Sequence, residues 1–146
     1  MDETLEAGVV LVRGSAAGFA QEIRAGRHRL LADEPVAAGG TDTGPGPYEL
    51  LLAALGACTS MTIGLYARRK RWSLDEVVVR LRHARVHTQD CADCETKEVM
   101  LDVIESEISL SGQLSQDQRG KLKDIAERCP VHRTLASAIN IRTRLI

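Results

Sequence analysis

Aromatic side chains are scarce in this chain, which has one tryptophan, two tyrosines and one phenylalanine among 146 residues. An excess of charge of one sign is also missing, because 19 Lys and Arg residues oppose 20 Asp and Glu residues, for a net charge of -1. Proteins that bind single-stranded nucleic acid use aromatic rings as stacking platforms and a basic surface for the phosphates. The composition therefore argues against nucleic acid as a partner.

A recognisable secretory signal is absent as well. From Met1 to Val12 the chain has neither the basic region nor the long apolar run of a signal peptide. We therefore expect a cytoplasmic protein, in a compartment that keeps thiols reduced. Its four cysteines should then be redox-active, metal-binding or inert, and not a framework of structural disulfides. A hydrophobic content of 44% fits one globular domain over residues 1–146.

What the chain does have is one dominant apolar stretch, between Pro47 and Arg71. It carries no charge from Leu50 to Ala67, its leucines fall on several faces, and it ends in basic residues that suit a helix C-terminus. We predict a long, buried central helix. A membrane span is not expected, because the uncharged run only just reaches the required length of about 18 residues and small or polar residues dilute its hydrophobicity. A helix that is apolar nearly all round also predicts a dimer.

The segments before this helix predict an antiparallel meander of three strands. They run from Gly8 to Arg13, from Phe19 to Arg24 and from Arg27 to Ala32, with small-residue turns between them. A loop rich in glycine and proline, from Asp33 to Gly46, should then deliver the chain to the helix.

After the helix, alternating apolar and polar residues predict two long strands paired as a hairpin. The first should run from Val77 to His87, after a turn at Ser73 to Glu76, and the second from Val99 to Leu110.

The last third of the chain predicts two helices and a strand. Ser115 and Gln118 form a capping-box pattern at the start of a helix that should stop before Pro130. A short helical piece should follow through Leu135, and the alternation from Ile139 to Ile146 predicts a final strand.

Two cysteines stand on predicted helices. Cys58 lies in the middle of the central helix among small residues that leave room for a molecule to reach its sulfur, although a small apolar core residue is the alternative interpretation. Cys129 lies where one helix ends and the next begins, with His132 and Arg133 nearby to favour a thiolate, while the end of the preceding helix opposes it. Their spacing does not decide whether they meet.

The segments GPYELLLAALGACTSMTI and CPVHRTL, with the Gly-rich loop before the first, resemble the two signature segments of the OsmC/Ohr family. This family contains the osmotically inducible and the organic hydroperoxide resistance proteins. The order of elements is similar over most of the chain. The resemblance implies an α+β fold with antiparallel sheets around a long central helix, and an intertwined homodimer with active sites at the subunit interface.

The resemblance also implies a thiol-dependent peroxidase without a metal or other cofactor. Cys58 would attack an organic hydroperoxide and become a sulfenic acid, and Cys129 would resolve it as a Cys58–Cys129 disulfide. An external dithiol, such as a lipoyl group, would then reduce the disulfide. The alternative is a non-catalytic member that binds a hydrophobic small molecule or a metal at the dimer interface.

Hydroperoxidases of the family activate the first cysteine with an arginine that a glutamate holds in place. Here Tyr48 stands at the glutamate position and Glu49 one step later, about 100° around the helix. Glu49 is our candidate catalytic carboxylate, with a helix N-terminal role as the alternative. Four arginines qualify as the activating cation, and Arg13 is favoured among Arg13, Arg24, Arg27 and Arg29.

The remaining cysteines, Cys91 and Cys94, form a CxxC pair in the predicted hairpin tip, outside both signature segments. One CxxC is half a zinc site, which His87 and an acidic or intersubunit group could complete. A redox-active pair and exposed thiols without a role are the alternatives. Acidic neighbours should raise the pKa of these thiols, which argues against strong nucleophiles. We expect them to be dispensable for turnover.

Overall fold

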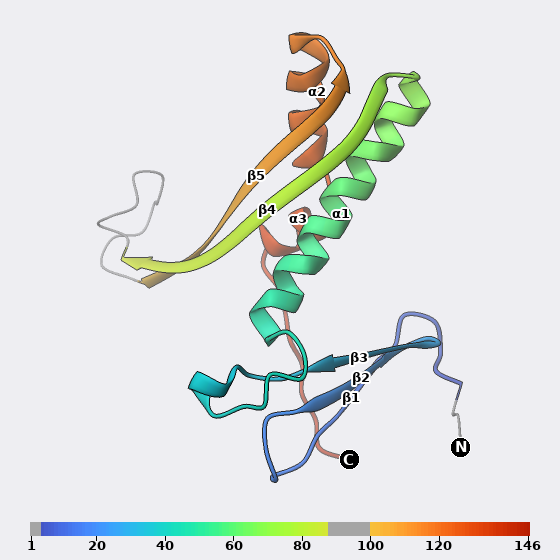
Figure 1. Cartoon of the computed structure of the whole chain (residues 1–146). Helices are drawn as coiled ribbons and strands as arrows, with labels where there is room; N and C mark the ends of the chain where they lie inside the picture. The colour runs from blue at the N-terminus through green and yellow to red at the C-terminus, as the bar shows by residue number, and fades with distance from the viewer. Residues whose placement is uncertain (1–3, 88–99) are drawn as a thin grey trace. The chain divides into compact units, whose positions relative to one another are not determined.

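Antiparallel strands and one long helix dominate the computed structural model, which describes residues 4–87 and 100–146 (Figure 1). The predicted α+β class is therefore confirmed. The chain divides into two compact units, Met1–Leu51 and Leu52–Ile146, which we describe separately. The boundary between the two units falls inside one continuous helix, Pro47–Lys70. That residues 1–146 fold cooperatively as a single domain stays a prediction.

The first unit contains the predicted meander. Strands β1 (Val10–Arg13), β2 (Gln21–Ala25) and β3 (His28–Ala32) form an antiparallel sheet in the order β1-β2-β3. Ile23 at the centre of β2 stands opposite Val12 on one side and Leu30 on the other. The apolar segments and the small-residue turns between them therefore placed these strands correctly, to within two residues at their ends.

The loop after β3 is organised by one buried carboxylate, Asp33. Its oxygens accept hydrogen bonds from the hydroxyls of Thr41 and Thr43 at 2.6 and 2.8 Å, and from the backbone N–H groups of Glu34, Thr41 and Thr43. The bonds from the Thr41 hydroxyl first and the Thr43 hydroxyl second hold the pKa of Asp33 far below its usual range. The loop thus has a defined path up to the start of the helix.

Helix α1 (Pro47–Lys70) is the predicted central helix, and it buries one stripe of its surface. The stripe consists of Leu55, Gly56, Thr59, Ile63 and Ala67. By length and composition alone α1 could cross a membrane, a test that the core helix of a water-soluble protein also passes. Arg71, with a φ of 57°, ends the helix, and the Trp72 N–H bonds back to the Ala67 carbonyl at 2.9 Å.

A hairpin and two further helices complete the second unit. Strands β4 (Ser73–His87) and β5 (Met100–Gln113) pair antiparallel, and helices α2 (Gln116–Ala126) and α3 (Pro130–Leu135) follow. The core lies where α1, α2 and the hairpin meet (Figure 1). It is built from Ile63, Ala67, Leu122 and Ala126, with Val77, Ile108 and Leu110 packed against them.

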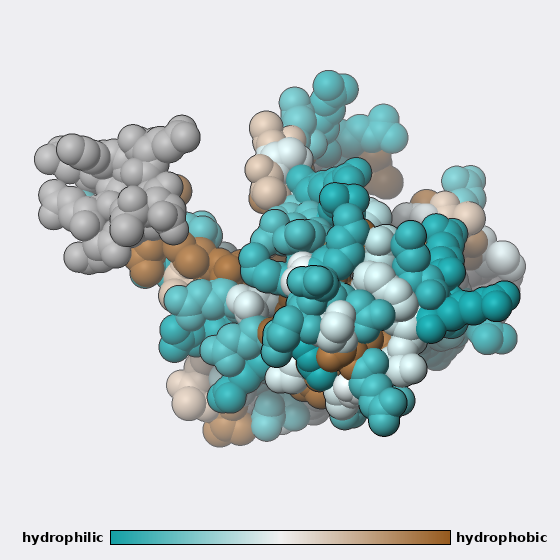
Figure 2. Space-filling view, turned by 90° about the horizontal axis from the view of Figure 1, so that it is seen from above, coloured by the Kyte–Doolittle hydropathy of each residue, from teal (hydrophilic) through white to brown (hydrophobic). Residues whose placement is uncertain are grey.

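The end of the molecule where α1 stops and α2 begins is seen in Figure 2, and its surface is mostly hydrophilic. The last turn of α1 is basic, with Arg68, Arg69 and Lys70. Helix α2 buries Leu122, Ile125 and Ala126, and most of its other residues are polar or charged. The predicted capping box is confirmed, because the Gln118 N–H bonds to the Ser115 hydroxyl and the Ser115 N–H bonds to the Gln118 side chain.

The turn predicted at Ser73 to Glu76 is wrong, since these residues begin β4. Ser73 pairs with Gln113 and Leu74 with Gly112, and a bulge lies between Leu74 and Glu76. Gly112 has a φ of 133°, and a Cβ on it would collide with the Ser73 carbonyl. Glycine therefore extends the hairpin past the point where strict alternation stops.

The predicted final strand, Ile139 to Ile146, is also wrong for the single chain. The residues after α3 form neither helix nor strand, and Ile141 is 83% exposed. A strand needs a neighbour for its backbone hydrogen bonds. Within the described residues of this chain, none of the strands β1 to β5 pairs with the tail.

We expect Asp33→Asn to lower the urea midpoint of unfolding at pH 7, because an amide nitrogen cannot accept the bonds that the carboxylate accepts. The folded-state pKa of Asp33 is depressed. Its stabilisation is therefore present above the unfolded-state pKa of about 3.9 and is lost as the pH falls below it. The wild type should lose this stability progressively from about pH 5 downward, past the unfolded-state pKa and toward the depressed folded-state pKa, and the variant should lose less.

Asp42→Asn is the matched control, since Asp42 is an exposed carboxylate of the same loop with a φ of 54°. Asn tolerates this left-handed conformation as well as Asp does. An equal loss of stability in the two variants at pH 7 would contradict the role of Asp33.

Candidate functional site: a pair of thiols

Cys58 lies halfway along α1, next to the stripe that faces the core. Gly56, two residues earlier, brings the helix close to β4, because a Cβ there would stand 2.8 Å from the Leu81 side chain. Thr59, one residue later, is buried. Cys58 itself is half-buried. The small residues that sequence analysis singled out therefore let the hairpin approach α1 closely, and they leave part of the Cys58 thiol accessible.

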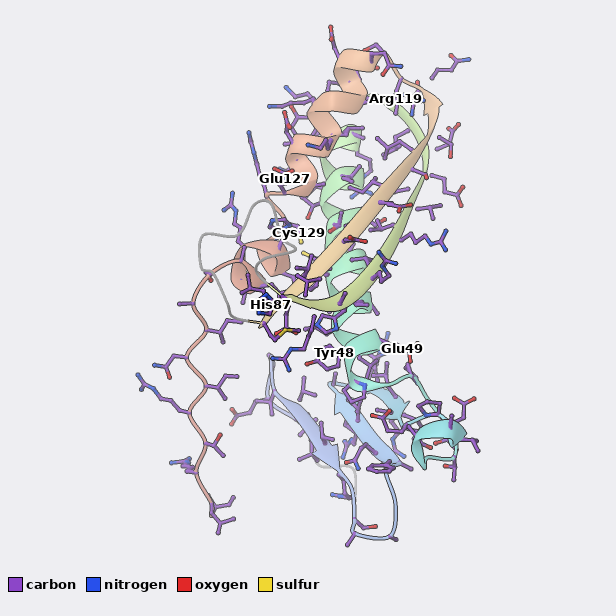
Figure 3. The ribbon with its side chains drawn as sticks, turned by 90° about the vertical axis from the view of Figure 1, so that its left-hand side faces the viewer. Tyr48, Glu49, His87, Arg119, Glu127 and Cys129 are labelled. Carbon is purple, nitrogen blue, oxygen red and sulfur yellow. The ribbon has the colours of Figure 1, made fainter. Side chains whose placement is uncertain are left out.

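Cys129 lies in the short link between α2 and α3, beside the middle of α1 (Figure 3). α3 begins directly after Cys129, with Pro130 at its first position, where the missing N–H of proline is tolerated. The Arg133 N–H closes the first turn of α3 on the Cys129 carbonyl at 3.0 Å. Cys129 is 0% exposed, so its thiol meets only protein groups.

The structure brings the two cysteines together. Both thiols are free, and the Cys129 thiol donates a hydrogen bond to the Cys58 sulfur. After the second half of α1, the hairpin and α2 return the chain to the middle of α1. Spacing left this meeting open, and the packing of the second unit supplies it.

The Cys58 thiol is the more acidic of the pair. Burial by itself would raise its pKa, but hydrogen bonds from the Cys129 thiol, the Val131 N–H and the Thr62 hydroxyl together outweigh burial and lower the pKa. Each of these donors stabilises the thiolate more than the thiol. Cys58 is therefore the nucleophile that this arrangement favours.

Cys129 shifts the other way. Burial raises the pKa of its thiol first, and the bond it donates to Cys58 and the charge of a Cys58 thiolate raise it further. The N–H groups of His132 and Val131 lower it only in part. The start of α3, which on its own would favour a Cys129 thiolate, is outweighed by burial and by the neighbouring sulfur.

Thr62 has one hydroxyl proton and two acceptors on Cys58. It donates to the Cys58 carbonyl oxygen at 2.7 Å, and it is also within hydrogen-bonding reach of the sulfur. Because the bond to the carbonyl is short, we assign the proton there in the resting state. The thiolate then depends mainly on Cys129 and Val131, and Thr62 can add a third bond by rotating its hydroxyl.

Sequence analysis missed Thr62 and the N–H groups of Val131 and His132. Thr62 could have been found, because it follows Cys58 by four residues and such residues are neighbours on one face of a helix. The two N–H groups carry no side-chain signal. They act on the sulfurs only because the chain turns at Pro130 beside α1.

Glu49 lies in the first turn of α1, within the first unit (Figure 3). Its carboxylate accepts a hydrogen bond from the Gly46 N–H at 3.1 Å, which fits the helix N-terminal role. Its catalytic role stays a prediction. Tyr48 precedes it, and all four candidate arginines lie in the first unit as well: Arg13 in β1, Arg24 in β2, Arg27 in the following turn and Arg29 in β3.

Among residues 4–87 and 100–146, no three His, Cys, Asp or Glu side chains are grouped so that they could hold a metal ion. His83 bonds to Asp102 at 2.9 Å near the distal end of the hairpin. The predicted CxxC site, Cys91 and Cys94, lies outside the described residues.

We expect Cys129→Ala to raise the pKa of Cys58, because it removes the thiol that donates to the Cys58 sulfur. Cys129→Ser keeps a donor and should preserve most of the effect. Alkylation of Cys58 by iodoacetamide, followed by mass spectrometry from pH 6 to pH 9, measures the difference. The Ala variant should react roughly tenfold more slowly at pH 7, and equal rates in both variants would contradict the hydrogen bond.

Solved structures share this fold. The OsmC-like protein from Mycoplasma pneumoniae matches with a TM-score of 0.68 at 18% identity, over 93% of this chain and 89% of that chain. The organic hydroperoxide resistance protein OsmC from Legionella pneumophila matches with 0.63 at 21% identity, over 91% of each chain. The organic hydroperoxide resistance protein OhrB of Bacillus subtilis matches with 0.58 at 21% identity, over 86% of this chain and 87% of that chain.

These identities are low enough that the likeness establishes the fold alone. No curated protein matches the sequence. The family model of the OsmC-like proteins matches residues 40–144, most of the chain and both signature segments. The resemblance inferred from those segments is thereby confirmed, and the chain belongs to the OsmC-like protein family.

Proposed function

We propose that this protein is a cysteine-based peroxidase that reduces organic hydroperoxides. The observation that carries the proposal is the hydrogen-bonded pair of Cys58, whose pKa is lowered, and Cys129, whose pKa is raised. Two of the similar structures are named organic hydroperoxide resistance proteins, which supports the same substrate class. The cysteines and their surroundings supply the chemistry without a cofactor.

In the first step the Cys58 thiolate attacks one oxygen of the hydroperoxide. The O–O bond breaks, an S–O bond forms, and the alkoxide leaves and takes a proton to become an alcohol. Sulfur is oxidised by two electrons to a sulfenic acid, and the peroxide is reduced by two electrons. The bonds from Cys129 and Val131 favour this step because they lower the pKa of Cys58 and so raise the fraction of its thiolate.

The second step uses the opposite shift at Cys129. While Cys58 is a thiolate, its bond and its charge keep the proton on Cys129. Conversion of Cys58 to a neutral sulfenic acid removes that charge, while the N–H groups of His132 and Val131 remain. Cys129 then becomes easier to deprotonate, attacks the Cys58 sulfur and expels the hydroxyl as water.

The cycle closes when an external dithiol, such as a lipoyl group, reduces the Cys58–Cys129 disulfide. Two thiols reform in the protein, and the dithiol leaves as a cyclic disulfide. Glu49 and one of the four arginines stay candidates for activating the substrate or Cys58. The proposal places this cycle in the cytoplasm.

One equivalent of an organic hydroperoxide should remove two free thiols per chain and join Cys58 to Cys129. Cys58→Ser should abolish peroxide consumption, because it removes the first nucleophile. Cys129→Ser, without reductant, should consume one equivalent and stop at a sulfenic acid that dimedone traps. Peptide mapping of the oxidised protein by mass spectrometry identifies the bridge.

The double variant Cys91→Ser, Cys94→Ser is the control, and it should keep full turnover with dithiothreitol or a lipoyl dithiol. If the only bridge found joined Cys91 to Cys94 while Cys58 stayed alkylatable, the peroxidase would be wrong. The non-catalytic binding protein would then be the remaining candidate.

We further propose that the protein functions as an intertwined homodimer. Opposite its buried stripe, α1 exposes a second apolar stripe of Ala54, Ala57, Met61 and Leu65, in which Met61 is 73% exposed. These residues follow one another by three or four positions, so they share one helix face. The tail of the chain also exposes Ile139 and Ile141. A second copy would cover the stripe and offer the tail a strand to pair with.

Light scattering should therefore find a dimer at micromolar concentration. Met61→Glu should shift the population toward monomer or unfolded chain, since it buries a charge in the proposed interface. Met61→Leu, which keeps an apolar side chain of similar size, should stay dimeric. A folded wild-type monomer at these concentrations would contradict the proposal.

A further inference from the structure

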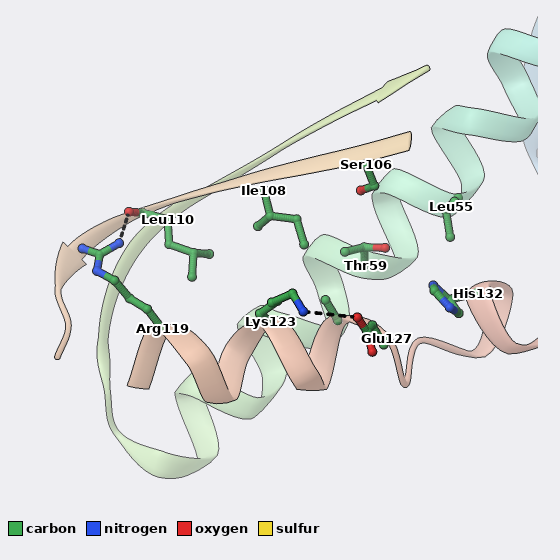
Figure 4. Close-up of a pocket in the computed structure, with 10 residues that line it drawn as sticks. Leu55, Thr59, Ser106, Ile108, Leu110, Arg119, Lys123, Glu127 and His132 are labelled. Carbon is green, nitrogen blue, oxygen red and sulfur yellow. Dashed lines mark hydrogen bonds and ion pairs between the residues drawn. The ribbon is translucent and has the colours of Figure 1, made fainter. Parts of the chain in front are cut away.

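A cavity of about 470 Å³ opens inside the second unit, between β5, α1, α2 and the start of α3 (Figure 4). Its size falls in the usual range for sites that bind small molecules. Cys58 and Cys129 do not line it. The cavity is therefore a feature of its own, which the peroxidase chemistry does not use.

One part of the cavity wall is apolar, although polar and charged side chains make up the rest of the lining. Leu55 on α1 and Ile108 and Leu110 on β5 present hydrocarbon to it (Figure 4). Ala126 on α2 also lines it. The burial of hydrocarbon on such a surface is favourable, at roughly 25 cal/mol per Å² of area removed from water. The cavity therefore suits the apolar body of a small molecule.

The guanidinium of Arg119 lies at one end of the cavity and is fixed there by two hydrogen bonds. The half-buried Arg119 donates from Nη1 to the Leu110 carbonyl at 2.7 Å and from Nη2 to the Gly112 carbonyl at 3.2 Å. A guanidinium has five N–H donors, so three remain after these two bonds. Among the residues that the structure describes, no carboxylate pairs with Arg119. The two carbonyl bonds fix its position, and no carboxylate of the described residues neutralises its charge.

The other cation of the cavity is already engaged. The Lys123 ammonium lies 3.6 Å from the Glu127 carboxylate, one turn further along α2 (Figure 4). Within residues 4–87 and 100–146, Arg119 is therefore the cation of this cavity that has no carboxylate partner. A single anionic charge balances it, whereas a phosphate monoester carries a charge of nearly two. A planar carboxylate also matches the two-pronged geometry of a guanidinium.

We propose that this cavity binds an apolar monocarboxylate, with its carboxylate on Arg119 and its hydrocarbon body against Leu55, Ile108 and Leu110. The site goes beyond the proposed peroxidase, because binding requires no thiol. Two of its lining residues are nevertheless close in sequence to the thiols. Thr59 directly follows Cys58, and His132 lies three residues after Cys129, in α3.

Octanoate and 1-octanol are the matched probes, because they share a chain length and differ in charge. Isothermal titration calorimetry on the reduced full-length protein should find octanoate bound about tenfold more tightly than 1-octanol, the size expected for one charged hydrogen-bonded contact. Cys58→Ser should bind octanoate as the wild type does. Equal affinity for both probes, or no octanoate binding at millimolar concentration, would overturn the proposal.

Two variants locate the site. Arg119→Gln should weaken octanoate about tenfold and leave 1-octanol unchanged, whereas the same substitution at the exposed Arg128, outside the cavity, should change neither. Ser106→Trp, at an exposed position of β5 that lines the cavity, should fill it and weaken both probes. Octanoate binding that survives Ser106→Trp unchanged would place the ligand elsewhere and overturn the proposal.

Discussion

The second unit depends on how closely the hairpin can approach α1. At Gly56 an added Cβ would stand 2.8 Å from the end of the Leu81 side chain on β4, so the hairpin side chains pack directly against this turn of the helix. Thr59, Ile63 and Ala67 continue the contact along one stripe. Because cores are close-packed, this spacing fixes where α2 can lie, and α2 in turn fixes where the link at Cys129 passes α1. The meeting of the two thiols is a consequence of helix packing.

Local patterns in the sequence were sufficient for most of the fold. Short segments bounded by small-residue turns placed the meander, alternation placed the hairpin, and the capping residues Ser115 and Gln118 placed α2. The failures came where structure depends on something other than local pattern. The start of β4 depends on the backbone freedom of Gly112 across the hairpin, and the tail has strand periodicity but lacks a partner strand within its own chain.

The candidate site was found only in part from the sequence. The resemblance of two motifs singled out Cys58 and Cys129, but the relative acidity of the thiols depends on which groups surround each sulfur in space. Helix-end reasoning considered the short helix α3 and could not include the burial of Cys129 or the N–H of Val131. The sequence does not single out Arg119 either, because its carbonyl partners and its place in the cavity depend on the folded structure.

Because Cys129 is completely buried, the two cysteines differ in their exposure to solvent. Cys58 is half-buried as a residue, whereas Cys129 has no exposed surface. In the proposed cycle, an incoming reductant can therefore form its mixed disulfide only on Cys58, and Cys129 is always the leaving group. Whatever its identity, the reductant must approach the same sulfur as the peroxide, so substrate and reductant compete for one entrance and cannot be bound there together.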